Sequence, residues 1–278
     1  MTIGLTRHLT PTKKGTQLFA YGKPVKSCGP FLLLIGTLFL ANGHPVAAAP
    51  EGDARDLVKR VMEALPRVPF TSTLTLTTAQ GVRQFALHHK FIDGARDSYL
   101  ELTAPEELKG IRFLFLERVN APADQYMKLA TSKTLMRVAD EVRTQPFLGS
   151  TFYIADLVTP PLDNFTYKLV GEEQILGRRA LLVEAAPKDP KKEIYGKTIM
   201  GLDPQDLLVL RRQFYDHDGQ ILKVWTVESI EKVDGIWTMT KQRMTNTQAN
   251  EQSRLEVQAI KYNVELPDAM FTPKYLLH

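Results

Sequence analysis

Short runs of alternating apolar and polar residues dominate the chain from residue 70 onwards. A period of two places successive side chains on opposite faces of a β-strand, and clusters of glycine, proline or aspartate separate most of the runs. The runs are residues 70–78, 82–91, 97–103, 111–117, 125–130, 134–138, 165–170, 180–186, 195–202, 207–215, 221–229, 236–244 and 255–262. Because their connections are short and contain no crossover helix, the pattern predicts a mainly β protein with a single antiparallel sheet.

A sheet of this size has to curl or split, because its strands twist. We expect a curled, open sheet of about 11–12 strands. The concave face of such a sheet forms a ligand cavity wherever side chains do not fill it. Residues 111–117 have apolar side chains on both faces of the predicted strand, so we expect it to be buried on both.

Residues 53–65 have a helical period instead, with Leu57, Val61 and Leu65 on one face and Pro66 after the end. We interpret this segment as an amphipathic helix that packs on the sheet. A helix that binds a partner protein is the alternative.

The middle of the chain, residues 147–157, has neither period. It is rich in aromatic residues, Gly149-Ser150 favours a turn, and residues 151–157 have room for one or two helical turns. An apolar segment between two sets of strands is either buried by them or covers what they enclose. The pattern alone leaves both alternatives open.

Residues 31–41 form one apolar run, preceded by two lysines and followed by small residues. This is the plan of a secretory signal peptide, and the run is shorter than the roughly 20 residues of a membrane-spanning helix. We therefore expect residues 1–48 to be a leader cleaved after Ala48, and residues 49–278 to be the exported domain. An uncleaved N-terminal anchor is the alternative.

The charge distribution supports this division. Five of the 35 Lys and Arg residues, and none of the 31 Asp and Glu residues, lie in residues 1–48. Without them 30 basic residues stand against 31 acidic ones, so the pI near 9.0 does not indicate a nucleic-acid surface. Cys28, the only cysteine, would leave with the leader, so we expect no disulfide in the exported domain. The segment before Lys23 is long for a leader, which favours translation starting nearer Val25.

Motifs of catalysis are absent from the sequence, which has no Gly-x-Ser-x-Gly, no phosphate-binding glycine loop, no dinucleotide fingerprint and no His-Glu-x-x-His. His88 and His89 are adjacent, so on a strand they point to opposite faces and cannot hold one metal. Residues 216–219 resemble the start of a calcium loop, but Val227 stands where the final Glu belongs, so a hairpin tip is the better interpretation. We expect no catalytic residue, no metal site and no cofactor.

A surplus of large apolar side chains remains. From the aromatic residues alone, an ordinary packed core is the preferred interpretation. A ligand cavity requires a further argument, which comes from a resemblance to a known family.

Seven segments, in this order, resemble the outer-membrane lipoprotein-sorting family, the LolA/LolB-like periplasmic carriers. They are residues 99–105 (YLELTAP), 108–115 (LKGIRFLF), 147–157 (FLGSTFYIADL), 202–204 (LDP), 214–219 (FYDHDG), 234–237 (DGIW) and 266–271 (LPDAMF). Together they extend across nearly all of the exported domain.

The resemblance implies an open antiparallel half-barrel with a few helices covering its concave face. It also implies a non-catalytic, monomeric periplasmic carrier of the acyl chains of lipoproteins or lipids, which an inner-membrane transporter donates and an outer-membrane acceptor receives. A non-catalytic accessory subunit of an envelope lipid exporter is the alternative. The expected lipid-binding residues are Leu100, Leu102, Phe113, Phe115, Phe147, Phe152, Tyr153, Leu157, Phe214, Trp225 and Trp237.

The chain departs from the family pattern within residues 147–157. Relatives often have an acidic residue, a tyrosine and a glutamate where this chain has Thr151, Ile154 and Ala155. Leu129-Ala130 replaces a Leu-Pro pair that is common in the family. Residues 147–157 are therefore less polar than in relatives, which predicts a cargo different from that of the relatives.

Overall fold

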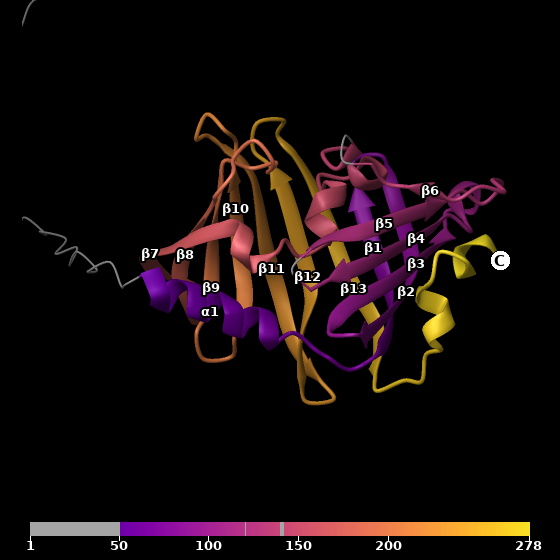
Figure 1. Ribbon diagram of the computed structural model, residues 1–278, viewed down its shortest axis with the longest axis horizontal. Helices are drawn as coiled ribbons and strands as arrows, with labels where there is room; N and C mark the ends of the chain where they lie inside the picture. Colours follow the sequence, from indigo (N-terminus) through magenta and orange to yellow (C-terminus); the bar gives the residue numbers. More distant parts are fainter. Residues whose placement is uncertain (1–50, 120, 140–141) are drawn as a thin grey trace, which may run out of the picture. The chain divides into compact units, whose positions relative to one another are not determined.

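The computed structural model describes residues 51–119, 121–139 and 142–278. Within these ranges the chain forms one antiparallel sheet of 13 strands, in the order β6-β5-β4-β3-β2-β1-β13-β12-β11-β10-β9-β8-β7 (Figure 1). The strands are β1 (Phe70–Thr78), β2 (Gly81–Ile92), β3 (Ala95–Ala104), β4 (Arg112–Arg118), β5 (Ala121–Lys128), β6 (Met136–Arg137), β7 (Phe165–Ile175), β8 (Arg178–Pro187), β9 (Lys197–Asp203), β10 (Leu208–Tyr215), β11 (Ile221–Val233), β12 (Ile236–Asn246) and β13 (Glu251–Tyr262).

The predicted mainly β fold with a single open antiparallel sheet is confirmed, with 13 strands against the expected 11–12. Within the described residues the outermost strands, β6 and β7, do not pair with each other, so the sheet does not close into a barrel. The predicted leader and its cleavage site after Ala48 lie outside the described residues.

The strand order explains where the middle of the chain must go. Neighbouring strands are consecutive in sequence except for β1 and β13, which pair in the register Leu74↔Val257 and Leu76↔Leu255. The chain therefore runs from the middle of the sheet outward to one edge at β6, restarts at the other edge with β7 and returns to the middle. The connection from β6 to β7 has to pass from edge to edge, and residues 147–157, here called the central segment, belong to it.

One α-helix and six short 3-10 turns accompany the sheet in the described part of the chain. They are α1 (Glu51–Glu63), η1 (Glu106–Leu108), η3 (Phe147–Gly149), η4 (Ile154–Leu157), η5 (Leu162–Asn164), η6 (Asp268–Phe271) and η7 (Tyr275–Leu277). None of the described helices is long and apolar enough to span a membrane.

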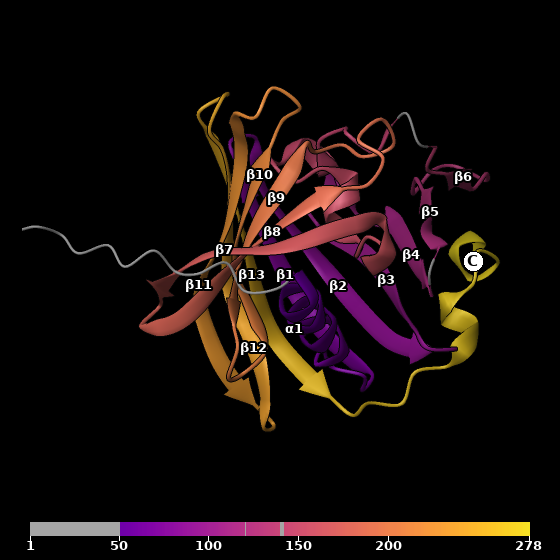
Figure 2. The ribbon, with the colours of Figure 1, turned by 60° about the vertical axis from the view of Figure 1, so that its left-hand side comes forward.

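The helix α1 covers one half of the inner face of the sheet. The helix lies along β7 to β10 (Figure 1). Its apolar side packs on these strands, where Leu57 and Val61 are buried with Tyr167 and Leu202. The turned view shows α1 inside the curl of the sheet (Figure 2). The predicted helix at residues 53–65 is therefore present, with both ends two residues earlier, and it packs on the sheet as expected.

Strand β4 shows how the two faces of the sheet are covered. Phe113 and Phe115 face the inner side and pack in the main apolar cluster. Leu114 faces the outer side and is buried under the C-terminal residues Phe271 and Leu276. The prediction that residues 111–117 are buried on both faces is confirmed.

Two of the expected turns have the predicted local chemistry. Asp234 and Gly235 both have positive φ, 52° and 81°, the geometry of a tight hairpin between β11 and β12. The Oδ1 atom of Asp216 accepts the backbone N–H groups of Asp218 and Gln220, at 3.1 and 2.8 Å. Residues 216–219 are therefore a hairpin tip, as expected, whose aspartate oxygen stabilises the turn itself.

His88 and His89 point to opposite faces, as predicted. The His88 ring lies 5.8 Å from the ring of Tyr99, whereas the buried His89 stacks on Phe70 at 4.6 Å. Burial, helped by the nearby Arg96, lowers the pKa of His89 to about 4.

On the neighbouring strand β3, burial raises the pKa of Asp97 to about 6, although Arg118 opposes the shift. Asp97 binds more protons in the folded state than in the unfolded chain between pH 3.8 and 6, so its contribution to the free energy of unfolding falls as the pH rises. His89 binds fewer protons in the folded state between pH 4 and 6.5, so its contribution rises with pH. The two contributions oppose each other in nearly the same window.

We predict that single substitutions separate these contributions. As the pH rises from 4 to 6, the stability of Asp97→Asn should rise relative to the wild type by up to about 3 kcal/mol. The reason is that the variant lacks the Asp97 contribution to the free energy of unfolding, which falls as the pH rises. Over the same range His89→Gln should lose stability relative to the wild type by a similar amount. Urea unfolding at a series of pH values measures both differences.

The double variant is the control. Its stability should follow the pH dependence of the wild type, because opposing contributions are removed together. Single variants whose curves run parallel to the wild type would contradict the prediction.

Candidate functional site

The central segment folds back on itself before it meets the strands. The N–H of Phe147 donates to the carbonyl of Phe152 at 2.8 Å, and Pro146 and Tyr153 form an isolated bridge. Leu148 in this loop adopts a left-handed backbone with φ 51°. The expected turn and short helical turns are therefore present, as η3 and η4.

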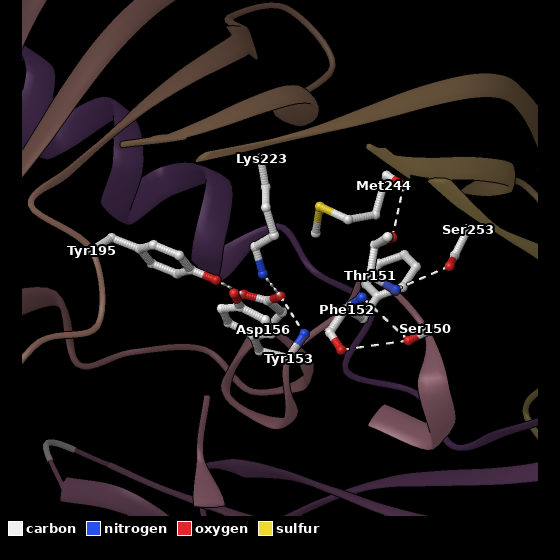
Figure 3. Close-up of polar contacts among 9 residues, drawn as sticks. All are labelled: Ser150, Thr151, Phe152, Tyr153, Asp156, Tyr195, Lys223, Met244 and Ser253. Atoms are coloured by element: carbon white, nitrogen blue, oxygen red, sulfur yellow. Dashed lines mark hydrogen bonds and ion pairs between the residues drawn. The ribbon is translucent and has the colours of Figure 1, made fainter. Parts of the chain in front are cut away.

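Two strands at the middle of the sheet hold this loop by hydrogen bonds. The N–H of Thr151 donates to Oγ of Ser253 on β13 at 3.0 Å, and its hydroxyl donates to the carbonyl of Met244 on β12 at 2.8 Å (Figure 3). On the other side the ring of Phe147 lies 5.0 Å from that of Phe113 on β4. The central segment thus lies on the inner face, and Thr151, where relatives often have an acid, is occupied with holding it there.

A buried ion pair fixes the second half of the central segment. Nζ of Lys223 on β11 lies 2.6 Å from Oδ2 of Asp156, and the two side chains are 0% and 4% exposed. Asp156 also accepts the hydroxyl of Tyr195 at 2.6 Å and the N–H of Tyr153 at 2.7 Å (Figure 3). The ammonium lies 3.4 Å from the centre of the Tyr153 ring, a cation–π contact.

The pKa shifts around the pair follow from its burial. Desolvation lowers the pKa of Lys223, and the carboxylate of Asp156 opposes this shift. Burial raises the pKa of Tyr195, and the nearby negative charge of Asp156 raises it further, so the phenol stays a hydrogen-bond donor. Each charge is tolerated here because the other is present.

A second ion pair holds the residues after the central segment. Arg96 on β3 and Glu117 on β4 are paired at 2.9 Å, and Glu117 accepts the N–H of Thr159 at 3.1 Å. Arg96 also donates to the hydroxyl of Thr159. The connection from β6 to β7 is therefore tied to both halves of the sheet.

An apolar cavity of about 340 Å³ lies between this connection and strands β4 and β5. Its volume falls in the range of roughly 300–1,000 Å³ that is typical of ligand pockets. The lining residues are Phe113, Phe115, Met127, Met136, Arg137, Val138, Ala139, Val142, Gln145, Phe147 and Ile154.

Most of the predicted lipid-binding residues meet on the inner face, but few of them line this cavity. Seven are buried in the main apolar cluster, namely Leu100, Leu102, Phe113, Phe115, Phe147, Phe152 and Phe214. Leu157 and Trp225 pack against the cluster, and Tyr153 lies beside Lys223. Of all these residues, Phe113, Phe115 and Phe147 line the cavity.

Trp237 is the predicted lipid-binding residue that lies away from the main apolar cluster. It packs between two cations on the outer face, 4.5 Å from the guanidinium of Arg178 and 4.6 Å from the ammonium of Lys232.

Sequence reasoning missed one cavity wall and the charges beside it. The wall comes from residues 136–139 and 142–147, and the only periodic pattern in this part of the sequence was the short predicted strand at 134–138. Lys223 lies two positions before Trp225, so on a strand both side chains face the same, inner side, and this could be read from the sequence. Its partner Asp156 could not, because it lies 67 positions away in an irregular segment. In the described part of the chain, no group of three or more His, Cys, Asp or Glu side chains is arranged to hold a metal ion.

We predict that Lys223→Met destabilises the protein by about 3–5 kcal/mol, because it leaves the buried carboxylate of Asp156 without its counter-charge. The double variant Lys223→Met/Asp156→Asn should recover much of this loss, since no buried charge remains. Urea unfolding measures both.

The matched control is Lys109→Met, which breaks an ion pair with Glu106 whose side chains are 56% and 81% exposed. It should cost less than about 1 kcal/mol. A Lys223→Met variant no less stable than this control would show that the buried pair does not hold the central segment.

Comparison with known proteins identifies a family for this chain. A family model described only as an uncharacterized protein matches residues 94–278. No curated protein matches the chain.

Several solved structures have a similar fold. A putative outer membrane lipoprotein-sorting protein domain from Vibrio parahaemolyticus superposes with a TM-score of 0.76 at 21% identity, over 82% of this chain and 100% of that one. A DUF1329 family protein from Desulfovibrio piger gives 0.74 at 24% identity, over 82% and 99%. A LolA superfamily protein from Nitrosomonas europaea gives 0.62 at 19% identity, over 80% and 98%.

These likenesses confirm the expected LolA-like architecture at the level of the fold. The chain therefore has a LolA-like fold and belongs to the family of uncharacterized proteins whose model matches residues 94–278.

Proposed function

We propose that the protein is a non-catalytic periplasmic carrier that shelters the acyl chains of a lipoprotein or lipid during transfer toward the outer membrane. Residues 1–48 would direct its export, and residues 49–278 would form the carrier domain. An inner-membrane transporter would supply the cargo and an outer-membrane acceptor would take it. The names of two similar structures support this proposal, a putative outer membrane lipoprotein-sorting protein domain and a LolA superfamily protein.

The observation that carries the proposal is the apolar cavity between β4, β5 and residues 136–139 and 142–154. Apart from Arg137 and Gln145, its lining side chains are apolar. Each CH₂ group of an acyl chain that leaves water gains about 0.8 kcal/mol, so a cavity of this kind favours a long chain over a polar solute.

The mouth of the cavity is apolar as well. Met136 and Val142, which line the cavity, are 36% and 38% exposed. Exposed apolar side chains at the rim of a cavity give an entering chain a continuous apolar path from the surface. We propose that cargo enters and leaves here, beside strand β6.

Lipid that stays bound through purification tests the proposal directly. Protein purified from its native compartment without detergent should carry lipid, which organic extraction and mass spectrometry would identify. A lipid-free protein that still binds an envelope transporter would favour the accessory-subunit alternative instead.

We predict that Val142→Trp weakens binding of an acyl-chain probe about tenfold or more, because the indole fills the mouth of the cavity. Fluorescence titration with a labelled fatty acid measures the affinity. The matched control is Val170→Trp on the edge strand β7, since Val170 is 42% exposed and is absent from the cavity lining. Equal affinities of the two variants would place the binding site elsewhere.

A further inference from the structure

Arg212 on β10 is a charged side chain at an unusual place. Its backbone lies between Met200 of β9 and Trp225 of β11, and Phe214, two positions on, packs in the main apolar cluster. The guanidinium carbon lies 5.9 Å from the centre of the Trp225 ring. Trp225 packs against both the main apolar cluster and the cluster under α1, so Arg212 lies on the inner face where the two clusters meet.

The Arg212 side chain is largely surrounded by protein, yet the residue as a whole is not fully buried. Desolvation lowers the pKa of Arg212, which reflects deep burial. Part of the residue nevertheless stays accessible to solvent. Arg212 is therefore a largely desolvated cation that solvent still reaches in part.

The charges around Arg212 do not balance. Asp156 attracts Arg212 but is paired with Lys223, and Arg96, which repels it, is paired with Glu117. Among the described residues, no carboxylate lies within ion-pair distance of Arg212, and its buried Nε has no hydrogen-bond partner. Three cations therefore share two carboxylates on this part of the inner face.

Buried charges in folded proteins are normally paired, because an unpaired one keeps its desolvation cost. The arginine fork matches a carboxylate or phosphate in geometry and forms charge-assisted hydrogen bonds with it. The apolar clusters on either side suit an aliphatic chain, which makes an amphipathic anion the occupant that satisfies both features.

We propose that Arg212 binds the anionic headgroup, a carboxylate or phosphate, of the lipid that the protein carries. This inference rests on the proposed function. The central segment extends between the apolar cavity and the surroundings of Arg212. Its residue Ile154 lines the cavity, and the carboxylate of its residue Asp156 attracts the guanidinium of Arg212.

The test compares two probes with the same chain, dodecanoate and dodecanol, on delipidated protein by titration calorimetry. The wild type should bind dodecanoate about tenfold or more tightly than dodecanol, as a charge-assisted hydrogen bond predicts. Arg212→Gln should lose this preference while its affinity for dodecanol stays unchanged, and Arg212→Lys should keep part of it. The matched control is Arg211→Gln, because Arg211 is paired with Glu173 at 2.6 Å and should not affect the preference.

Equal binding of both probes by the wild type would overturn the role of Arg212 and leave the carrier function intact. This comparison does not depend on whether any variant folds. A wild type that binds neither probe would overturn both proposals. Inorganic phosphate is the third probe. If it alone binds in an Arg212-dependent way, and dodecanoate is bound no better than dodecanol, the site takes a free anion and the headgroup proposal fails.

Discussion

The ion pair between Lys223 and Asp156 is the constraint on which the inner face depends. Both charges lie where water does not reach, so either one alone would carry an uncompensated desolvation cost. The sheet supplies the lysine and the connection between the two edge strands supplies the aspartate. The connection can therefore settle on the inner face in one position, with Asp156 opposite β11, and Tyr153 and Tyr195 complete the surroundings of the pair. The tight packing of the segment around Phe152 follows from this placement.

The same constraint determines where the fold leaves space. α1 covers the inner side of β7 to β10, and the central segment covers the middle of the sheet, where it is bonded to β12 and β13. Toward the other edge the sheet ends with β6, which has two residues and offers little surface to a cover. Residues from 136–139 and 142–147 line the cavity at this end of the sheet. The hollow is thus at the edge farthest along the strand order from the helix.

The fold could be predicted from the sequence because a two-residue period and short turns leave few arrangements, and residues 111–117 even showed burial on both faces. The residues of the site were harder to predict from the sequence. Trp225 and Trp237 are the same kind of residue on neighbouring strands, but Trp225 packs against the main apolar cluster whereas Trp237 packs between Arg178 and Lys232. A register shift between the pairs Ser229↔Lys241 and Ile230↔Met239 interrupts the alternation of β12, so the position of Trp237 cannot be counted from Met244. Composition does not distinguish the two; strand register does. The partnership of Lys223 with a residue 67 positions away depends on the path of an irregular segment, which no local pattern encodes.

A charge on the apolar inner face of the sheet also bears on selectivity. Hydrophobic burial alone distinguishes lipids poorly, because each methylene contributes about 0.8 kcal/mol whatever the headgroup. It also makes long chains hard to release. An unpaired buried cation such as Arg212 changes this balance, because a neutral lipid leaves the cation unpaired whereas an anionic one satisfies it. Binding then needs less apolar contact to be specific, and a cavity of modest size at one edge of an open sheet is enough. The packed core around the central segment and the small hollow beside it are consistent with a carrier that recognises its cargo by the headgroup.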